Sequence, residues 1–323
     1  SLTYTNIKDF GIHIEEKFHR LNGLYWLNYV SGLFGLDNFQ KITEFKISQI
    51  SDYTLSSIVK YNKYGVVLDL PVAILEVVFK VNNLAEIYYL KHFISFIIFL
   101  ASSLVFFKIL EKRFNNFILC FAGTILFITT PRIFGDSFLY KDVLYLSFFT
   151  FTVYFFIKCF ENPKAKNLVL FALFTALSIN LRIFSILIPF IFIFLIFVKN
   201  FFKRKLVQDL LKIFIYLIFL FIFLYIFWPY LWDNPFKNFY QLFISLDQDL
   251  IDVKILFNGN FISNRALPDT YILNWIIMTS PMAQIVLFFF GFAYCLIRFT
   301  KRYLRINEKI IYNDLWRSNN EKL

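Results

Sequence analysis

Residues that could take part in chemistry occur in short polar groups between long apolar segments. The first group is Glu15, Glu16 and His19, with Gly23 after it. Two adjacent acids with a histidine three residues on could hold a general base beside a charged substrate. The same spacing also suits the solvated face of a helix, so the pattern leaves both interpretations open.

A second polar group lies between two apolar segments, at residues 131–142. Arg132 and Lys141 supply positive charge, and Asp136 and Asp142 supply acid. A charge costs about 2.5–3.5 kcal/mol at the centre of a membrane-spanning helix and less at its ends. Topology signalling is one explanation. Basic residues on a loop predicted to be external oppose the orientation rule, however, and this favours a role in function.

Three further residues are candidate contacts for a phosphate or a lipid-linked substrate. Arg182 interrupts an apolar stretch, where its guanidinium could bind a phosphate bidentately or could pair with an acid such as Asp142. Tyr230 belongs to the aromatic run 228–235, which is also typical of an interfacial aromatic belt. Arg265 follows an acidic stretch and precedes the last long apolar segment.

Long apolar segments must position these groups. The chain has 323 residues, of which 59% are hydrophobic and 17% charged, against about 25% charged in soluble domains. A bilayer crossing needs about 20 mostly apolar residues. The candidate spans are 92–110, 114–131, 141–159, 167–180, 183–198, 211–229 and 271–298. These spans predict an all-α, polytopic transmembrane bundle of about seven helices.

Charge in the connections tests this layout. Basic clusters follow the first, third, fifth and last spans, so the positive-inside rule predicts that they are cytoplasmic. The alternation holds only if residues 167–198 cross twice, with a turn at Arg182. As one helix this segment would be about 46 Å long, against a core of about 30 Å.

The same alternation predicts three regions and places the polar groups on the external face. Residues 1–90 form an external region with interfacial helices at Leu24–Phe34 and Val66–Val81. Residues 91–299 form the bundle, and residues 300–323 a basic cytoplasmic tail. An external N-terminal region needs an exporting segment, so we expect the chain to be an internal piece of a longer protein.

The sequence gives little support to other functional classes, such as metal-binding or nucleic-acid-binding proteins. The three cysteines and three histidines show no metal or disulfide spacing. The net charge of +11 fits basic cytoplasmic loops, and no nucleic-acid motif is visible. Charges at mid-span, which a transport path would need, are few. This favours an enzyme, with a lipid or lipid-linked sugar flippase as the alternative.

Four runs in order carry a family resemblance: PRIFGDSFLYKD, NLRIFSILIP, WPYLWDNP and LPDTYILNW. Over about residues 9–300 the chain resembles bacterial membrane glycosyltransferases of the C superfamily. The closest group is the one related to protein O-mannosyltransferases and to the aminoarabinose transferase of lipid A.

The resemblance implies a glycosyltransferase C-type fold and transfer, with inversion, of a sugar from a polyprenyl-phosphate donor. The acceptor is a protein, lipid or glycan on the external face, which in bacteria is the periplasmic face of the inner membrane, among membrane lipids. No cofactor is implied, although a divalent metal ion is compatible with the chemistry.

The resemblance also implies roles for particular residues. The acidic pair of the first external loop matches Glu15 and Glu16, with Asp9 as a second candidate base. The Lys-Asp pair matches Lys141 and Asp142. The implied catalytic residues are Glu15, Glu16 and Asp142. The implied substrate-binding residues are His19, Arg132, Asp136, Lys141, Arg182, Tyr230 and Arg265.

Overall fold

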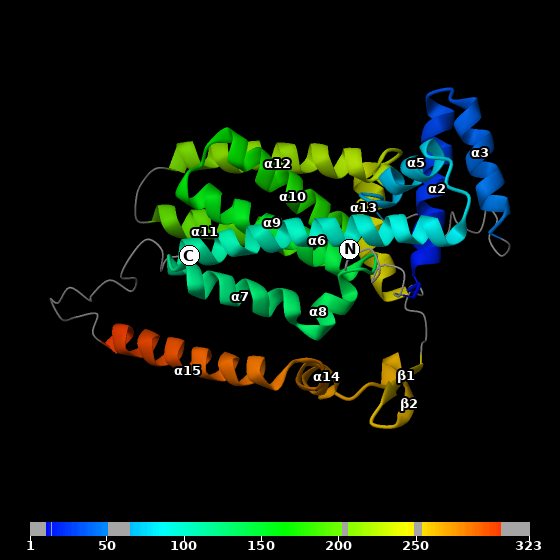
Figure 1. Ribbon diagram of the computed structural model, residues 1–323. Coiled ribbons are helices and arrows are strands. Elements are labelled where there is room, and N and C mark those ends of the chain that lie inside the picture. The colour runs from blue at the N-terminus through cyan, green and yellow to red at the C-terminus, as the bar shows by residue number, and fades with distance from the viewer. Residues whose placement is uncertain (1–10, 14, 51–64, 202–205, 249–253, 305–323) are drawn as a thin grey trace. The chain divides into compact units, whose positions relative to one another are not determined.

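The computed structural model describes residues 11–13, 15–50, 65–201, 206–248 and 254–304. It is 80% helical, which confirms the all-α class. The chain divides into two compact units. The first comprises residues 1–106 and 136–245, and the second residues 107–135 and 246–323 (Figure 1).

Helices make up the described part of the first unit, together with two short 3-10 turns. In chain order they are α2 (Glu16–Leu33), α3 (Asp37–Ser48), α5 (Asp69–Val78), α6 (Leu84–Phe114, which continues into the second unit), α9 (Asp142–Glu161), α10 (Ala165–Leu181), η1 (Ile183–Ile186), α11 (Leu187–Phe201), α12 (Leu206–Phe227), η2 (Pro229–Leu231) and α13 (Pro235–Gln248).

The apolar core of the first unit centres on α10, which packs between α9 and α12 (Figure 1). Phe171 of α10 stacks on Tyr216 of α12 with ring centroids 4.5 Å apart. The Tyr216 hydroxyl donates to Thr175 at 3.3 Å. Small and hydroxyl-bearing residues on α10 let its neighbours approach closely, as is common between helices in an apolar environment.

The predicted break at Arg182 is confirmed. α10 ends at Leu181, and Arg182 is extended, with φ −144° and ψ 113°. The rings of Phe171 in α10 and Phe192 in α11, on opposite sides of the break, are 5.0 Å apart. α11 therefore folds back along α10, as a two-helix interpretation of 167–198 requires.

The prediction of one continuous span at 271–298 is wrong. The segment forms two helices, α14 (Tyr271–Thr279) and α15 (Met282–Leu304). Ser280 between them is extended, with φ −96° and ψ 136°. Pro281 explains the break, because proline lacks an N–H donor and disfavours helical backbone in the residue before it.

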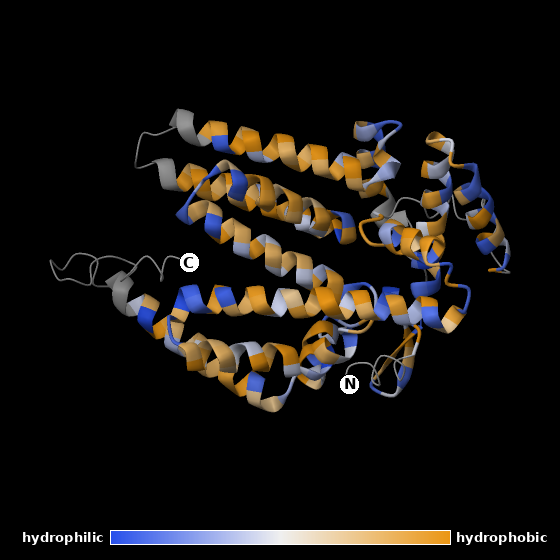
Figure 2. Ribbon diagram, turned by 45° about the horizontal axis from the view of Figure 1, so that its top comes forward, coloured by the Kyte–Doolittle hydropathy of each residue, from blue (hydrophilic) through white to orange (hydrophobic). Residues whose placement is uncertain are grey.

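Within the described residues, four helices are long and apolar enough to cross a membrane: Leu84–Phe114, Asp142–Glu161, Leu210–Phe227 and Met282–Thr300. Three further apolar helices, at Phe117–Thr129, Ala165–Leu181 and Ile183–Val198, are shorter. Figure 2 shows the apolar character along the long helices and the hydrophilic segments that connect them. The count of about seven crossings stays a prediction for the shorter helices.

The second unit contains α7 (Phe117–Thr129), most of α8 (Pro131–Asp136), α14, α15 and a β-hairpin. Strands β1 (Lys254–Phe257) and β2 (Asn260–Ser263) pair antiparallel, with Phe257 opposite Asn260. Asn258 and Gly259 both have positive φ, 48° and 81°, as a two-residue hairpin turn requires. The hairpin lies between the predicted spans 211–229 and 271–298, and the pattern of apolar and polar residues did not predict it.

Candidate functional site

The ends of four helices meet at one end of the first unit. Asn180, near the end of α10, accepts a hydrogen bond from the Val67 main-chain N–H at 3.3 Å and donates to the Phe227 carbonyl at 2.9 Å. Asp142 at the start of α9 pairs with Arg182 just after α10. The start of α6 joins them through His92, described below. These ends are the ones that the alternation of basic loops assigns to a common side.

The two adjacent acids at the start of α2 have different environments. Glu16 is fully buried. Its carboxylate accepts hydrogen bonds from His92 Nε2 of α6 at 3.0 Å and from the Tyr140 main-chain N–H at 3.2 Å. The side chain of Glu15 is 43% exposed. A rotation of about 100° per helical residue separates neighbouring side chains in this way.

His19, one turn further along α2, faces Asp69 at the start of α5. His19 Nδ1 donates to Asp69 Oδ2 at 3.1 Å, and Asn22 Nδ2 donates to the same oxygen at 2.8 Å. Burial raises the pKa of Asp69, but the facing His19 and the hydrogen bonds outweigh it, so the pKa is lowered overall. The pair thus holds a charged carboxylate inside the unit.

Gly23 allows this approach of α2 to α5. A Cβ atom at Gly23 would clash with the main-chain oxygen of Asp69 and would crowd the side chain of Ala73. The absence of a side chain at Gly23 therefore permits the contact between His19 and Asp69.

A second buried ion pair ties α2, α3 and α5 together. Arg20 binds Glu76 bidentately, through Nε at 3.1 Å and an Nη at 2.8 Å. Lys46 of α3 lies 3.1 Å from the same carboxylate and donates to the Val81 carbonyl at 2.7 Å. A bidentate guanidinium–carboxylate pair fixes both position and orientation.

Two partly exposed ion pairs lie beside the buried network. Glu15 pairs with Lys141, and Asp142, whose side chain is 60% exposed, pairs with Arg182. Burial raises the pKa of Glu15, but the contact with Lys141 and the nearby charges of His19 and Arg182 outweigh it, so the pKa is lowered. We call Glu15, Lys141, Asp142 and Arg182 the rim quartet.

Lys91 of α6 is a charged residue in the interior. It is 1% exposed, and its Nζ lies 4.5 Å from the centre of the Tyr140 ring. Among the described residues, no hydrogen-bond acceptor contacts this Nζ. Burial, together with the Asp69 carboxylate, raises the pKa of Tyr140 well above its ordinary value. The Lys91–Tyr140 contact is a cation–π interaction.

Sequence reasoning missed Asp69, Asn22, Lys91 and His92 as members of the site. A signal was present for Asp69, because it is one of two acids within the mostly apolar segment 66–81. Lys91 and His92 stand at the beginning of an apolar span, where a charge already indicates a special environment. Their partners could not be read from the sequence.

The remaining predicted site residues lie elsewhere. Tyr230, in η2, donates to Gln241 of α13 at 3.3 Å. Asp136 ends α8. Arg132 and Arg265 belong to the second unit, where the Arg132 guanidinium lies 5.1 Å from the Trp275 ring centre. The structure therefore joins Arg182 to Asp142 in the first unit, whereas Arg132 and Arg265 belong to the second unit. Asp9 lies outside the described residues.

The site contains ion pairs and hydrogen bonds between side chains of the described residues. In the part of the chain that the structure describes, no group of three or more histidine, cysteine, aspartate or glutamate side chains could hold a metal ion.

Searches for similar proteins found no matching family model, curated protein or solved structure.

Proposed function

We propose that the chain is a multi-pass membrane glycosyltransferase. It transfers a sugar from a polyprenyl-phosphate donor to a protein, lipid or glycan acceptor on the external face, in bacteria the periplasmic face of the inner membrane. The observation that carries the proposal is the rim quartet, which places a partly exposed carboxylate beside two cations at one end of long apolar helices.

The quartet has the groups that an inverting displacement needs. Glu15 takes the proton of the acceptor hydroxyl while that oxygen forms a bond to the anomeric carbon. The bond from that carbon to the donor phosphate oxygen breaks, and the electron pair leaves with the polyprenyl phosphate. Lys141 and Arg182 stabilise the departing anion, because charge-assisted hydrogen bonds to phosphate are strong.

Exposure favours Glu15 over Glu16 as the base. Glu16 is fully buried and already accepts hydrogen bonds from His92 and Tyr140. We therefore assign Glu16 a positioning role, in which it holds α2 against α6 and the segment before α9. Asp142 is the second candidate base, and its pairing with Arg182 also orients the guanidinium.

The charge distribution along the helices favours transfer over transport. Lys91 and His92 lie in the first third of α6, and residues 93–107 of that helix carry no charged side chain. In α9 the interval from Val143 to Ile157 is also free of charge. A polar transport path would require ionisable groups near the middle of such helices.

Transfer from a labelled polyprenyl-phosphate sugar to acceptor, with purified protein, tests the proposal. We expect Glu15→Gln to lower kcat by about 10²–10⁴-fold, the usual contribution of a general base. Glu86→Gln, at an exposed acid in the first turn of α6, is the matched control and should keep wild-type activity. Arg182→Ala should raise the KM for the donor.

Other results would redirect or overturn the proposal. Full activity in Glu15→Gln, with loss in Asp142→Asn, would assign the base to Asp142. Absence of transfer with every donor, together with lipid translocation in vesicles, would replace the glycosyltransferase by a flippase.

A further inference from the structure

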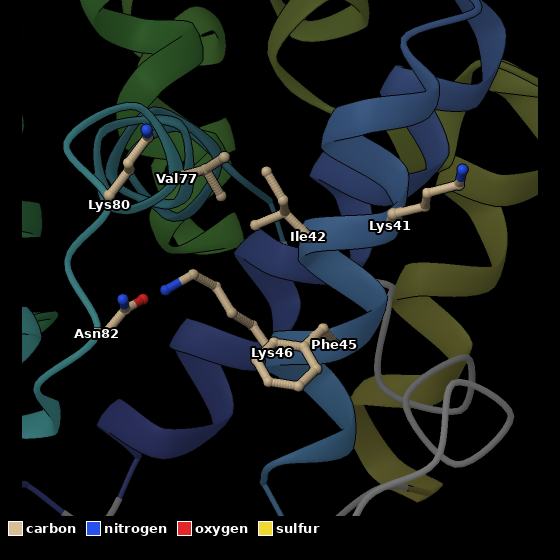
Figure 3. Close-up of a pocket in the computed structure, with 7 residues that line it drawn as sticks. All are labelled: Lys41, Ile42, Phe45, Lys46, Val77, Lys80 and Asn82. Atoms are coloured by element: carbon tan, nitrogen blue, oxygen red, sulfur yellow. The ribbon is translucent and has the colours of Figure 1, made fainter.

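A pocket lies between α3 and α5 in the first unit, with a volume of about 350 Å³. Figure 3 shows its lining residues, which come from these two helices and from the chain just after α5. They are Lys41, Ile42, Phe45, Lys46, Val77, Lys80 and Asn82. The rim quartet contributes no residue to this pocket.

The wall of the pocket is apolar and accessible. Ile42 and Val77 face each other across it (Figure 3), and the Phe45 side chain is 63% exposed. Val78 and Phe79, next to Val77, are 53% and 67% exposed. Exposed apolar side chains beside an apolar pocket are typical of a binding site for an apolar group or of contact with a membrane.

Positive charge borders the apolar wall. The Lys46 charge is already compensated, because its Nζ contacts Glu76 and the Val81 carbonyl. Lys41 and Lys80 are exposed and lie at opposite edges of the pocket, and the Asn82 side chain points toward Lys46 (Figure 3). The edges therefore carry two exposed cations, one on each side of the apolar wall.

The pocket also adjoins a candidate membrane crossing. α6 begins at Leu84, two residues after Asn82, and is one of the four helices long and apolar enough to span a bilayer. A ligand that is apolar on one part and anionic on another, and that is abundant where such a helix enters the membrane, is an anionic phospholipid.

We propose that this pocket binds one anionic phospholipid of the surrounding bilayer. An acyl chain lies against Ile42, Phe45 and Val77. The phosphate accepts a hydrogen bond from Lys80, and Lys41 adds attraction from the other edge. This site is separate from the proposed transfer site and needs no sugar donor.

Native mass spectrometry of the detergent-purified full chain tests the site, with phosphatidylglycerol and phosphatidylcholine of identical acyl chains as probes. We expect tighter binding of phosphatidylglycerol. Each lysine near a membrane surface contributes a factor of about five, so Lys41→Gln with Lys80→Asn should weaken it about 25-fold. Asparagine suits position 80 because Lys80 has φ 52°.

Two further variants separate charge from apolar contact. Lys164→Gln with Lys166→Gln removes two exposed charges elsewhere in the unit and should leave lipid binding unchanged. Phe45→Ser, at a largely exposed position, should weaken both lipids similarly because it removes acyl-chain contact. Circular dichroism confirms that each variant keeps its helices, and the single lysine variants serve if the double variant does not fold.

Three results would overturn the proposal. These are equal binding of the two lipids, unchanged phosphatidylglycerol binding in Lys41→Gln with Lys80→Asn, or displacement of bound phosphatidylglycerol by polyprenyl phosphate at equal concentration. Sugar transfer, measured in parallel, should be retained in the lysine variants, so failure of the lipid site and failure of the transferase proposal give different results.

Discussion

At the scale of single residues, adjacency in the sequence hides a difference in role. Glu15 and Glu16 are adjacent acids in the sequence. Glu15 pairs with Lys141 at the rim, whereas Glu16 is enclosed by His92 and Tyr140. The cost of removing a carboxylate therefore differs between them. A buried charge-assisted hydrogen bond contributes more to stability than an exposed ion pair does.

This difference predicts separate effects on stability and activity. Glu16→Gln should lower the free energy of unfolding by about 1.5–3 kcal/mol, because it weakens buried hydrogen bonds to a charged group. Glu15→Gln should change the free energy of unfolding by less than about 1 kcal/mol. Thermal unfolding in detergent measures both, and equal stability of the two variants would contradict the buried role of Glu16.

Asp69 predicts a pH dependence of stability. Its pKa in the folded chain is lowered below the ordinary 3.8. Above pH 3.8 the carboxylate is charged in both folded and unfolded chains, and its stabilisation is fully present. As the pH falls toward the folded pKa, the unfolded chain takes up the proton first, so the stabilisation is lost. The stability difference between wild type and Asp69→Asn should therefore shrink below about pH 4.

Thermal unfolding of both proteins between pH 3 and pH 7 measures this difference. A difference that stays constant over the whole range would show that the charge on Asp69 does not contribute. If the stability difference between wild type and Asp69→Asn disappeared already above pH 5, this would also disagree with a lowered pKa of Asp69.

At the scale of elements, helix packing brings the site together. α2 and α5 approach closely only because Gly23 has no side chain. Gly23→Ala should separate the two helices and weaken the His19–Asp69 contact, at a cost of about 1–3 kcal/mol, which is typical of overpacking. Thermal unfolding in detergent measures the loss.

Gly291 in α15 is the matched control, since a Cβ atom there meets no atom within 4 Å. Gly291→Ala should be neutral or stabilising by up to about 1 kcal/mol, because alanine favours helix over glycine. A Gly23→Ala variant as stable as Gly291→Ala would show that α2 moves away from Asp69 without cost.

At the scale of the whole molecule, the proposed topology predicts which positions face outside. Cys120 and Cys159 are buried, so replacing Cys295 by serine leaves a background with low reactivity. In that background, a membrane-impermeant maleimide added to intact cells should label Asp233→Cys. It should label Lys164→Cys only after permeabilisation. Both positions are exposed in the structure, so the reverse pattern would invert the proposed orientation.

The helical class, the apolar segments and the break at Arg182 can be predicted from the sequence alone, because they depend on composition and on the pattern of local charge. The sequence did not predict the break at Pro281 or the hairpin at 254–263, where local backbone chemistry overrode the general pattern of apolar and polar segments. Sequence also located the acids and bases of the rim quartet but not how they pair.

Which of these residues are partners depends on how the helices pack. His19 and Asp69 are 50 positions apart, and Glu15 and Lys141 are 126 apart. Whether a carboxylate is buried depends on the rotation of its helix and on which distant helix covers it, and neither is encoded in spacing along one segment. The fold thus assigned Glu15 to the accessible rim and Glu16 to the interior.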